Sequence, residues 1–207
     1  MIVAIDGPAA SGKGTLARRI AAELGLRYLD TGSIYRAVAL ACLRAGVDVA
    51  DAGEAARLAE ALDAAHLDEP ALRDPGVGEA ASVVSAHPGV REALLGWQRR
   101  FADTPPGAVL DGRDIGTVVC PEADAKLFVT ATPEVRAARR AAELRSKGHD
   151  VTDEAVLADI LRRDARDQAR ASAPLRQADD ADLLDTTDLS IEAAFQAALG
   201  IVTRARH

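Results

Sequence analysis

A glycine-rich loop follows the first apolar run of the chain and constrains the fold more than any other feature. The run Ile2–Ile5 leads into Gly7-Pro8-Ala9-Ala10-Ser11-Gly12-Lys13-Gly14-Thr15, and Leu16–Leu24 then has the length of a helix. Glycine lets the backbone adopt positive φ and approach a phosphate closely, so that several N–H groups converge on it. Lys13 adds a cation that reaches the β and γ phosphates. The sequence therefore predicts a strand, a phosphate-binding loop and a helix that together bind a triphosphate.

The loop departs from its usual pattern next to the residue that would hold magnesium. Gly14 follows Lys13 where Ser or Thr is usual, and the hydroxyl comes one place later, on Thr15. We infer that Mg²⁺ is held largely by phosphates and water, with Thr15 near the β phosphate. Asp111, at the end of another apolar strand, would orient the ion through water. Its alternative role is to form a turn before Gly112.

Apolar runs of strand length alternate with amphipathic segments of helix length, which predicts an α/β fold with a parallel sheet. The expected strands are Ile2–Ile5, Arg27–Leu29, Ala108–Leu110, Lys126–Thr130 and Asp182–Leu184. Three helices should begin after Thr132, Thr152 and Ser190, because each is followed by acidic residues in a helical pattern. Residues 1–207 are predicted to form a single domain around one five-stranded sheet.

Two interruptions of this alternation predict accessory parts. Residues 46–107 contain Ala-rich helical pieces broken by Glu69-Pro70 and Asp74-Pro75-Gly76, and are expected to form an inserted subdomain. Residues 140–170 are expected to form a lid region, in which the turn Ser146–Asp150 separates two Arg-rich helices.

Composition excludes several classes of protein. The net charge of −7 argues against a nucleic-acid polymer as partner, because such binding depends on many Lys and Arg residues. No apolar run reaches the roughly 18 residues that a membrane span needs. Cys42 and Cys120 lack metal-binding or redox spacing and are expected to be reduced, packed thiols. We therefore expect a soluble, cytoplasmic protein, and the moving insert and lid favour a monomer.

A nucleotide-dependent switch is the competing class of function, since such switches read guanine with an Asn-Lys-x-Asp segment. The chain contains no asparagine, which favours a small-molecule kinase instead. A kinase needs a cationic pocket for its anionic acceptor. Arginines are placed to form one: Arg36 and Arg113 follow predicted strands, where open α/β sheets bind ligands.

Further arginines share helix faces in the lid region. Arg163, Asp167 and Arg170 fall at i, i+4 and i+7, on one face of the helix after the turn, and Arg136, Arg139 and Arg140 share a face of the helix before it. Taken singly, each of these arginines could equally be a solvated surface charge. Their joint placement favours a binding site.

Five segments of the chain together resemble the bacterial cytidylate kinases over essentially the full length: IDGPAASGKGT, LDTGSIYR, ASVVSAHPGVREALL, DGRDIGTVV and RRDARDQARASAPL. The resemblance implies a three-layer P-loop fold with an inserted subdomain that binds a nucleoside monophosphate. It also implies that the chain transfers phosphate from Mg-ATP to CMP or dCMP. Between Leu67 and Ala80 the chain lacks the strand alternation of the small antiparallel sheet that the family commonly carries there.

The resemblance assigns roles to individual residues. Lys13 and the loop, together with Arg140 and Arg166, would bind ATP, and Lys13, Arg113, Arg170 and Asp111 would be catalytic. The residues implied in CMP binding are Thr31, Tyr35, Arg36, Ser82, Arg91, Arg113, Asp114, Arg163, Asp167 and Arg170.

The chemistry of cytosine suits part of this assignment. Its exocyclic amine is a donor beside two acceptors, so a carboxylate such as Asp114 suits the amine and a guanidinium such as Arg91 suits the acceptors. UMP is expected to be a poor acceptor. The alternatives are a uridylate/cytidylate kinase or an adenylate kinase, and a P-loop ATPase that drives assembly is a more distant one.

Overall fold

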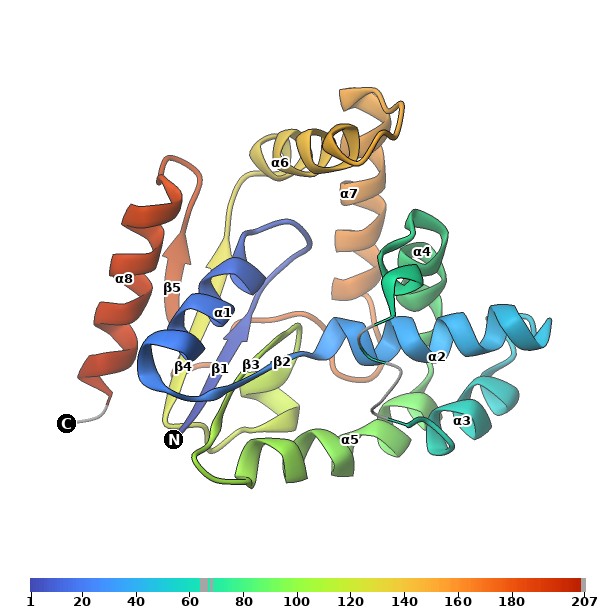
Figure 1. Ribbon diagram of the computed structural model, residues 1–207, viewed down its shortest axis with the longest axis horizontal. Coiled ribbons are helices and arrows are strands. Elements are labelled where there is room, and N and C mark those ends of the chain that lie inside the picture. The colour runs from blue at the N-terminus through green and yellow to red at the C-terminus, as the bar shows by residue number, and fades with distance from the viewer. Residues whose placement is uncertain (64–66, 68, 206–207) are drawn as a thin grey trace. The chain divides into compact units, whose positions relative to one another are not determined.

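The computed structural model describes residues 1–63, 67 and 69–205, apart from the side chain of Pro75 (Figure 1). The chain divides into two compact units, one formed by Met1–Leu29 with Pro105–His207 and the other by Asp30–Thr104.

The first unit contains a five-stranded sheet and helices that follow its strands. Its strands are β1 (Ile2–Asp6), β2 (Arg27–Asp30), β3 (Ala108–Gly112), β4 (Ala125–Thr130) and β5 (Asp182–Asp185). Its helices are α1 (Lys13–Leu24), the π-helical turn η3 (Ile115–Val119), α6 (Pro133–Ser146), α7 (Asp153–Gln168) and α8 (Ile191–Arg204). All five predicted strands are confirmed.

The strands are ordered β2-β3-β1-β4-β5, and β1 lies at the centre of the sheet. It pairs in parallel with β3, where Ile2 lies opposite Ala108, and with β4, where Val3 lies opposite Ala125. Because β1 and β3 are parallel neighbours, the glycine loop after β1 and the segment after β3 lie at the same edge of the sheet. Open α/β sheets bind ligands at this edge, where neighbouring connections diverge.

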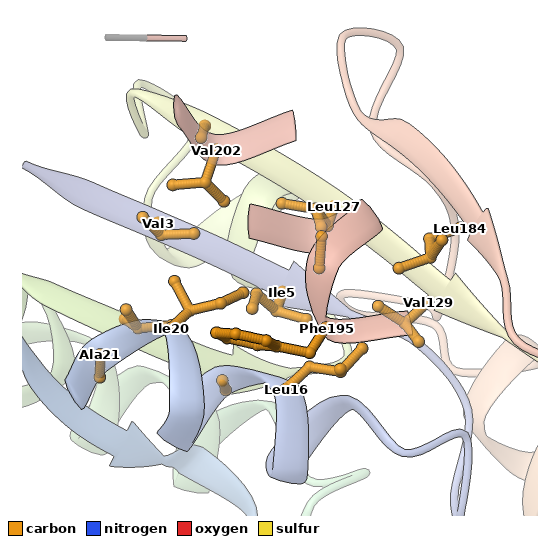
Figure 2. Close-up of a cluster of buried hydrophobic side chains, with 14 of the residues drawn as sticks. Val3, Ile5, Leu16, Ile20, Ala21, Leu127, Val129, Leu184, Phe195 and Val202 are labelled. Carbon is orange, nitrogen blue, oxygen red and sulfur yellow. The ribbon is translucent and has the colours of Figure 1, made fainter. Parts of the chain in front are cut away.

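The largest core of this unit lies between the sheet and the helices α1 and α8. Figure 2 shows Leu16 and Ile20 of α1 and Phe195 of α8 meeting over Val3 and Ile5 of β1. These strand side chains are fully buried, as the continuous apolar run predicts for a central parallel strand. Burial of each large aliphatic or aromatic side chain contributes about 1.5–3 kcal/mol, so this core fixes α1, and with it the end of the glycine loop.

Three helices begin where the sequence predicts. The hydroxyl oxygens of Thr132, Thr152 and Ser190 accept hydrogen bonds from the N–H groups three residues later, at 3.4, 3.2 and 3.1 Å. Each cap satisfies a backbone donor that has no partner within its helix. The first two caps start α6 and α7, the helices of the predicted lid region.

Beyond Asp30, the last residue of β2, the regular elements described in the second unit are helices. It contains α2 (Thr31–Ala45), α3 (Ala52–Glu60), the 3₁₀ turn η2 (Pro70–Arg73), α4 (Pro75–Val84) and α5 (Pro88–Asp103). Helix α2 packs on α3 and α4, and α3 packs on α5. The compact unit thus includes α2 as well as most of the insert predicted at 46–107. Residues 64–66 and 68 of that insert lie outside the described residues.

Cys42 and Cys120 are both buried thiols outside any disulfide, as predicted. Among the described helices, none has the length and apolar character needed to cross a membrane.

Candidate functional site

The glycine loop joins the end of β1 to the start of α1 and forms a concave backbone turn. Its φ angles are 152° at Gly7, 59° at Ala10 and 90° at Gly12, and alternation of such positive angles with ordinary ones turns N–H groups inward. A Cβ atom on Gly7 would lie 2.0 Å from the carbonyl oxygen of Val129 in β4. Only glycine fits at this position, because the carbonyl oxygen and carbon of Val129 belong to the backbone of a sheet strand and cannot move aside.

Contacts from elsewhere in the first unit hold the loop's outward carbonyls. Arg136 donates from Nη1 to the Ala9 oxygen at 3.1 Å, and Thr186 donates from Oγ1 to the Ser11 oxygen at 3.2 Å. With these carbonyls engaged, the opposite N–H side of the loop is fixed in shape. Sequence analysis assigned no loop contact to Arg136 and did not single out Thr186, since their partners are 127 and 175 residues away.

Two loop side chains are arranged for an incoming anion. Lys13 is buried and donates from Nζ to the Pro8 oxygen at 3.3 Å, within the loop itself. Ser11 is fully buried, and its Oγ has no hydrogen-bond partner among the described residues. A buried hydroxyl without a partner costs about 1–3 kcal/mol, which a bound phosphate oxygen would recover.

Asp111 lies at the end of β3, beside the first turn of α1. Its Oδ1 accepts a hydrogen bond from Tyr28 at 2.7 Å, and its Oδ2 would be 3.6 Å from a Cβ on Gly14. Tyr28 therefore fixes the carboxylate so that its second oxygen lies over Gly14. Thr15, the next residue along α1, is exposed. Carboxylate and hydroxyl oxygens are ligands that Mg²⁺ accepts, either directly or through water.

Asp6, the last residue of β1, stabilises the segment after β3. Its two carboxylate oxygens accept hydrogen bonds from the N–H groups of Ile115 and Gly116, both at 2.8 Å. Burial raises the pKa of Asp6 from 3.8 to about 7. The two backbone hydrogen bonds and Lys13 oppose this rise, and Asp114 adds to it. The carboxyl thus connects the strand before the glycine loop to the turn after Asp114.

The raised pKa of Asp6 predicts a specific pH dependence of stability. The folded protein binds a proton at this site between pH 4 and pH 7 more readily than the unfolded chain does. The stabilising contribution is therefore greatest below about pH 4 and is lost as the pH rises through about 7. Asp6→Asn does not titrate, so its urea midpoint should decrease less between pH 5 and pH 8 than that of the wild type. Equal decreases in the two proteins would contradict the raised pKa.

Three arginines surround Asp167 of α7. Arg113 donates from Nε to Oδ2 at 2.8 Å, and Arg170 donates from Nη2 to Oδ1. Burial raises the pKa of Asp167, but the charges of Arg113, Arg170 and Arg163 outweigh it, and the pKa lies below its ordinary 3.8. The pKa of Arg163 is lowered from its ordinary value, first by burial and then by repulsion from Arg113. Asp167 thus holds Arg113 and Arg170 and attracts Arg163, whose charge Asp159 also stabilises.

The structure corrects one detail of this cluster. Sequence analysis placed Arg163, Asp167 and Arg170 on one helix face, but α7 ends at Gln168 and Arg170 lies beyond it. The chain turns back there, because the Leu175 N–H donates to the Asp167 oxygen at 2.9 Å and Pro174 cannot continue a helix. Arg170 still reaches Asp167 from the segment that follows the helix.

The other arginines of α6 have separate partners. Arg139 donates to the Thr186 hydroxyl and carbonyl at 3.0 and 2.7 Å, and Arg140 donates to Glu143 of its own helix at 2.7 Å. Arg166 is half-buried on α7. The predicted ATP contacts of Arg140 and Arg166 stay predictions.

In the second unit, Tyr35, Ser82 and Arg91 come together from α2, α4 and α5. The Arg91 guanidinium carbon lies 5.4 Å from the centre of the Tyr35 ring, and Nη1 donates to the Ser85 oxygen at 3.1 Å. Ser85 in turn donates to the Ser82 oxygen at 3.2 Å. The Ser82 hydroxyl is buried and has no hydrogen-bond partner among the described residues. A fixed guanidinium and an unsatisfied hydroxyl are suited to binding a polar ligand.

At the start of α2, Arg36 folds back on the end of β2. Its Nη2 donates to Oδ2 of Asp30 at 2.6 Å, and a Cβ on Gly32 would lie 3.0 Å from its Nη1. Thr31, the first residue of α2, is buried. The guanidinium of Arg36 is only partly buried, so a phosphate could compete with Asp30 for it.

Comparison with known proteins decides the family. Residues 3–204 match the sequence profile of the family described as cytidylate kinase. The chain belongs to the cytidylate kinase family. It is 62% identical to the cytidylate kinase of Azorhizobium caulinodans, over 100% of both chains. It is 61% identical to that of Rhodopseudomonas palustris strain BisA53, over 100% of this chain and 98% of the relative.

Solved structures with little sequence similarity share the fold of this cytidylate kinase family member. A sugar kinase from Janibacter matches over 98% of this chain and 94% of its own, with a TM-score of 0.52 and 17% identity. An uncharacterised protein from Eubacterium ventriosum matches over 98% of both chains, with a TM-score of 0.58 and 11% identity. These similarities confirm the predicted α/β fold with its parallel sheet. They carry no information on substrates or site residues.

Proposed function

We propose that this member of the cytidylate kinase family transfers the γ-phosphoryl group of Mg-ATP to CMP or dCMP, giving ADP and CDP or dCDP. The observation that carries the proposal is the cluster of three arginines around Asp167, in the same unit as the glycine loop. The loop suits a triphosphate, and the guanidinium groups of Arg113 and Arg170 suit a second phosphate.

Catalysis would come from positioning and from charge stabilisation. Lys13 would exchange its hydrogen bond to the Pro8 oxygen for the transferred phosphoryl group, whose equatorial oxygens carry the developing charge. Arg113 and Arg170 are held by Asp167 and would orient the acceptor phosphate in line. No side chain needs to act as a strong general base, because the acceptor phosphate is already nucleophilic. Closure of the lid region 140–170 would exclude water and limit ATP hydrolysis.

Asp111 and Thr15 fit a magnesium site. Tyr28 fixes the Asp111 carboxylate over the first turn of α1, and both candidate residues offer the hard oxygen ligands that Mg²⁺ prefers. When bound, Mg²⁺ would neutralise charge on the β and γ phosphates. The two side chains would hold the ion largely through water.

An acidic residue, a basic residue and a hydroxyl would recognise the cytosine base of the acceptor. Asp114 is buried in the first unit and suits the exocyclic amine of cytosine, whereas Arg91 and Ser82 of the second unit suit its acceptor atoms. Tyr35, Thr31 and Arg36 would complete the CMP contacts of the second unit, and Arg163 and Asp167 would lie near the ribose. The monomeric state and the cytoplasmic location stay predictions.

An acceptor panel tests the proposed function. ADP release from ATP is measured with CMP, dCMP, UMP and AMP, and CMP or dCMP should give the highest kcat/KM. Asp114→Ala should lower the CMP-to-UMP ratio of kcat/KM by at least about tenfold, because a buried polar partner of the base is lost. The KM for ATP should stay nearly constant. Glu122→Ala, an exposed acidic residue, is the matched control.

Two outcomes would contradict these assignments. A wild-type preference for UMP or AMP would overturn the proposed substrate. An Asp114→Ala protein that loses thermal stability but keeps its CMP-to-UMP ratio would remove Asp114 from base recognition.

A further inference from the structure

Arg136 of α6 is a buried arginine that connects three parts of the first unit. Its side chain is 4% exposed. Nε donates to the Ala131 oxygen at 2.9 Å and Nη1 to the Ala9 oxygen of the glycine loop at 3.1 Å. The other edge of the guanidinium forms a two-pronged ion pair with Asp164 of α7, at 3.1 and 2.5 Å. One planar group thus binds the end of β4, the glycine loop and α7 together.

Apolar packing joins the same parts. A small buried cluster contains Ala9 of the glycine loop together with residues of α6 and α7, and Ala10 packs against it. The helix residues of the cluster are Ala137, Ala141, Leu144, Val156 and Ile160. Figure 1 shows α6 and α7 joined by their turn. The helices α6 and α7 therefore share a hydrophobic core with the phosphate-binding loop.

The residue that Arg136 pairs with lies among the proposed acceptor-binding residues. Asp164 directly follows Arg163 and lies one helical turn before Asp167, the carboxylate that holds Arg113 and Arg170. A helix of this length moves as a unit, so the position of Asp164 sets the position of Arg163 and Asp167. The ion pair between Arg136 and Asp164 therefore connects the helix that carries Arg163 and Asp167 to the glycine loop.

Stability alone does not explain a buried ion pair. Removing two charges from water costs several kcal/mol per ion, and well-packed apolar residues are often as stable. A guanidinium differs from an apolar side chain in that its fork fixes direction as well as distance. The hydrogen bonds of Arg136 join α6 to the residue after β4, to the glycine loop and to α7, and so fix the positions of these segments.

We propose that Arg136 is a positioning residue for phosphoryl transfer, which through Asp164 holds α7 and its arginine cluster in register with the glycine loop. This inference rests on the proposed function, because it assigns the donor phosphates to the loop and the acceptor phosphate to the cluster. Arg136 itself touches neither substrate.

The test compares Arg136→Lys and Asp164→Asn with Arg145→Lys. Lysine keeps the charge but cannot span the two carbonyls and the carboxylate together, and asparagine keeps the size of Asp164 but removes its charge. Arg145 is a matched control, because it binds a carbonyl and a carboxylate, those of Val151 and Asp153, at the half-exposed far end of α6. Steady-state kinetics are run well below each unfolding midpoint, and calorimetric ATP titration counts the folded sites.

We expect kcat per folded site to fall by about 100-fold in Arg136→Lys and Asp164→Asn, the loss that follows misplacement by about 1 Å. The KM for CMP should change by less than about threefold, because each substrate still meets its own residues. The double variant should be no slower than the slower single variant, since both changes break one connection. Arg145→Lys should retain wild-type kcat.

An unchanged kcat per folded site in either variant, with only a lower unfolding midpoint, would reduce Arg136 to a structural role and overturn the inference. Additive losses in the double variant would also overturn it. A wild-type protein that prefers another monophosphate would instead refute the proposed substrate. The same comparison with that acceptor would still decide the role of Arg136.

Discussion

Replacement of Lys13 by alanine is expected to lower kcat by on the order of 10³-fold while CMP binding is retained. Lys13 begins α1, is buried in the loop, donates to the Pro8 oxygen at 3.3 Å and lowers the pKa of Asp6 by its charge. Alanine is a favourable helix residue, so the substitution preserves the helical backbone at the start of α1. The charge that it supplies to the transferred phosphoryl group has no substitute at that place.

Two measurements check this expectation: ADP release gives kcat, and calorimetry with CMP alone gives the acceptor affinity. Arg57→Ala on α3 is a suitable control, because Arg57 is an exposed cation that pairs with Glu54 of the same helix. Turnover retained within about tenfold would show that the loop does not act through this charge. Parallel loss of CMP binding would show that the substitution damages more than the triphosphate site.

Replacement of Gly7 by alanine is expected to destabilise the fold by at least about 3 kcal/mol. The added Cβ would lie 2.0 Å from the Val129 oxygen and 3.1 Å from its carbon, and neither atom can move without breaking β4 from the sheet. The φ of 152° adds further strain for a residue with a side chain. Such a loss is a large part of the stability of a whole domain, which is only about 5–15 kcal/mol.

Gly25→Ala separates the steric effect from the backbone effect. Gly25 also has positive φ, at 64°, but a Cβ added there would have nothing within 4 Å of it. The substitution should therefore cost only about 1 kcal/mol, the strain of a left-handed residue. Urea unfolding of the two variants gives the comparison. A Gly7→Ala protein as stable as Gly25→Ala would contradict this expectation, because it would show that the Val129 carbonyl can move away from the added Cβ.

Local signals made much of the fold predictable. The strands were found because each is a short apolar run bounded by loop residues, and Thr132, Thr152 and Ser190 cap helices as single residues with local partners. The glycine loop was recognisable because phosphate binding demands its spacing.

Contacts between distant segments could not be predicted in the same way. The sequence does not show that Asp6 binds the turn at Ile115, or that Arg136 reaches Ala9, because those pairs form only after the strands are ordered. The end of α7 depends similarly on Leu175, seven residues beyond the helix, which caps Asp167. Sequence thus located the charged residues, and tertiary structure determined which of them meet and which segments they join.

The central place of β1 in the sheet also affects how the chain folds during synthesis. Its two neighbours begin at Ala108 and Ala125, so the first strand to leave the ribosome has no partner until more than half of the chain has been made. The glycine loop also lacks a packing partner until then, because its close neighbour Val129 belongs to β4, the later of those two strands. Such distant pairing slows folding and leaves apolar strand edges exposed in the nascent chain. ATP therefore cannot guide the early steps of folding, although its loop is among the first segments to be translated.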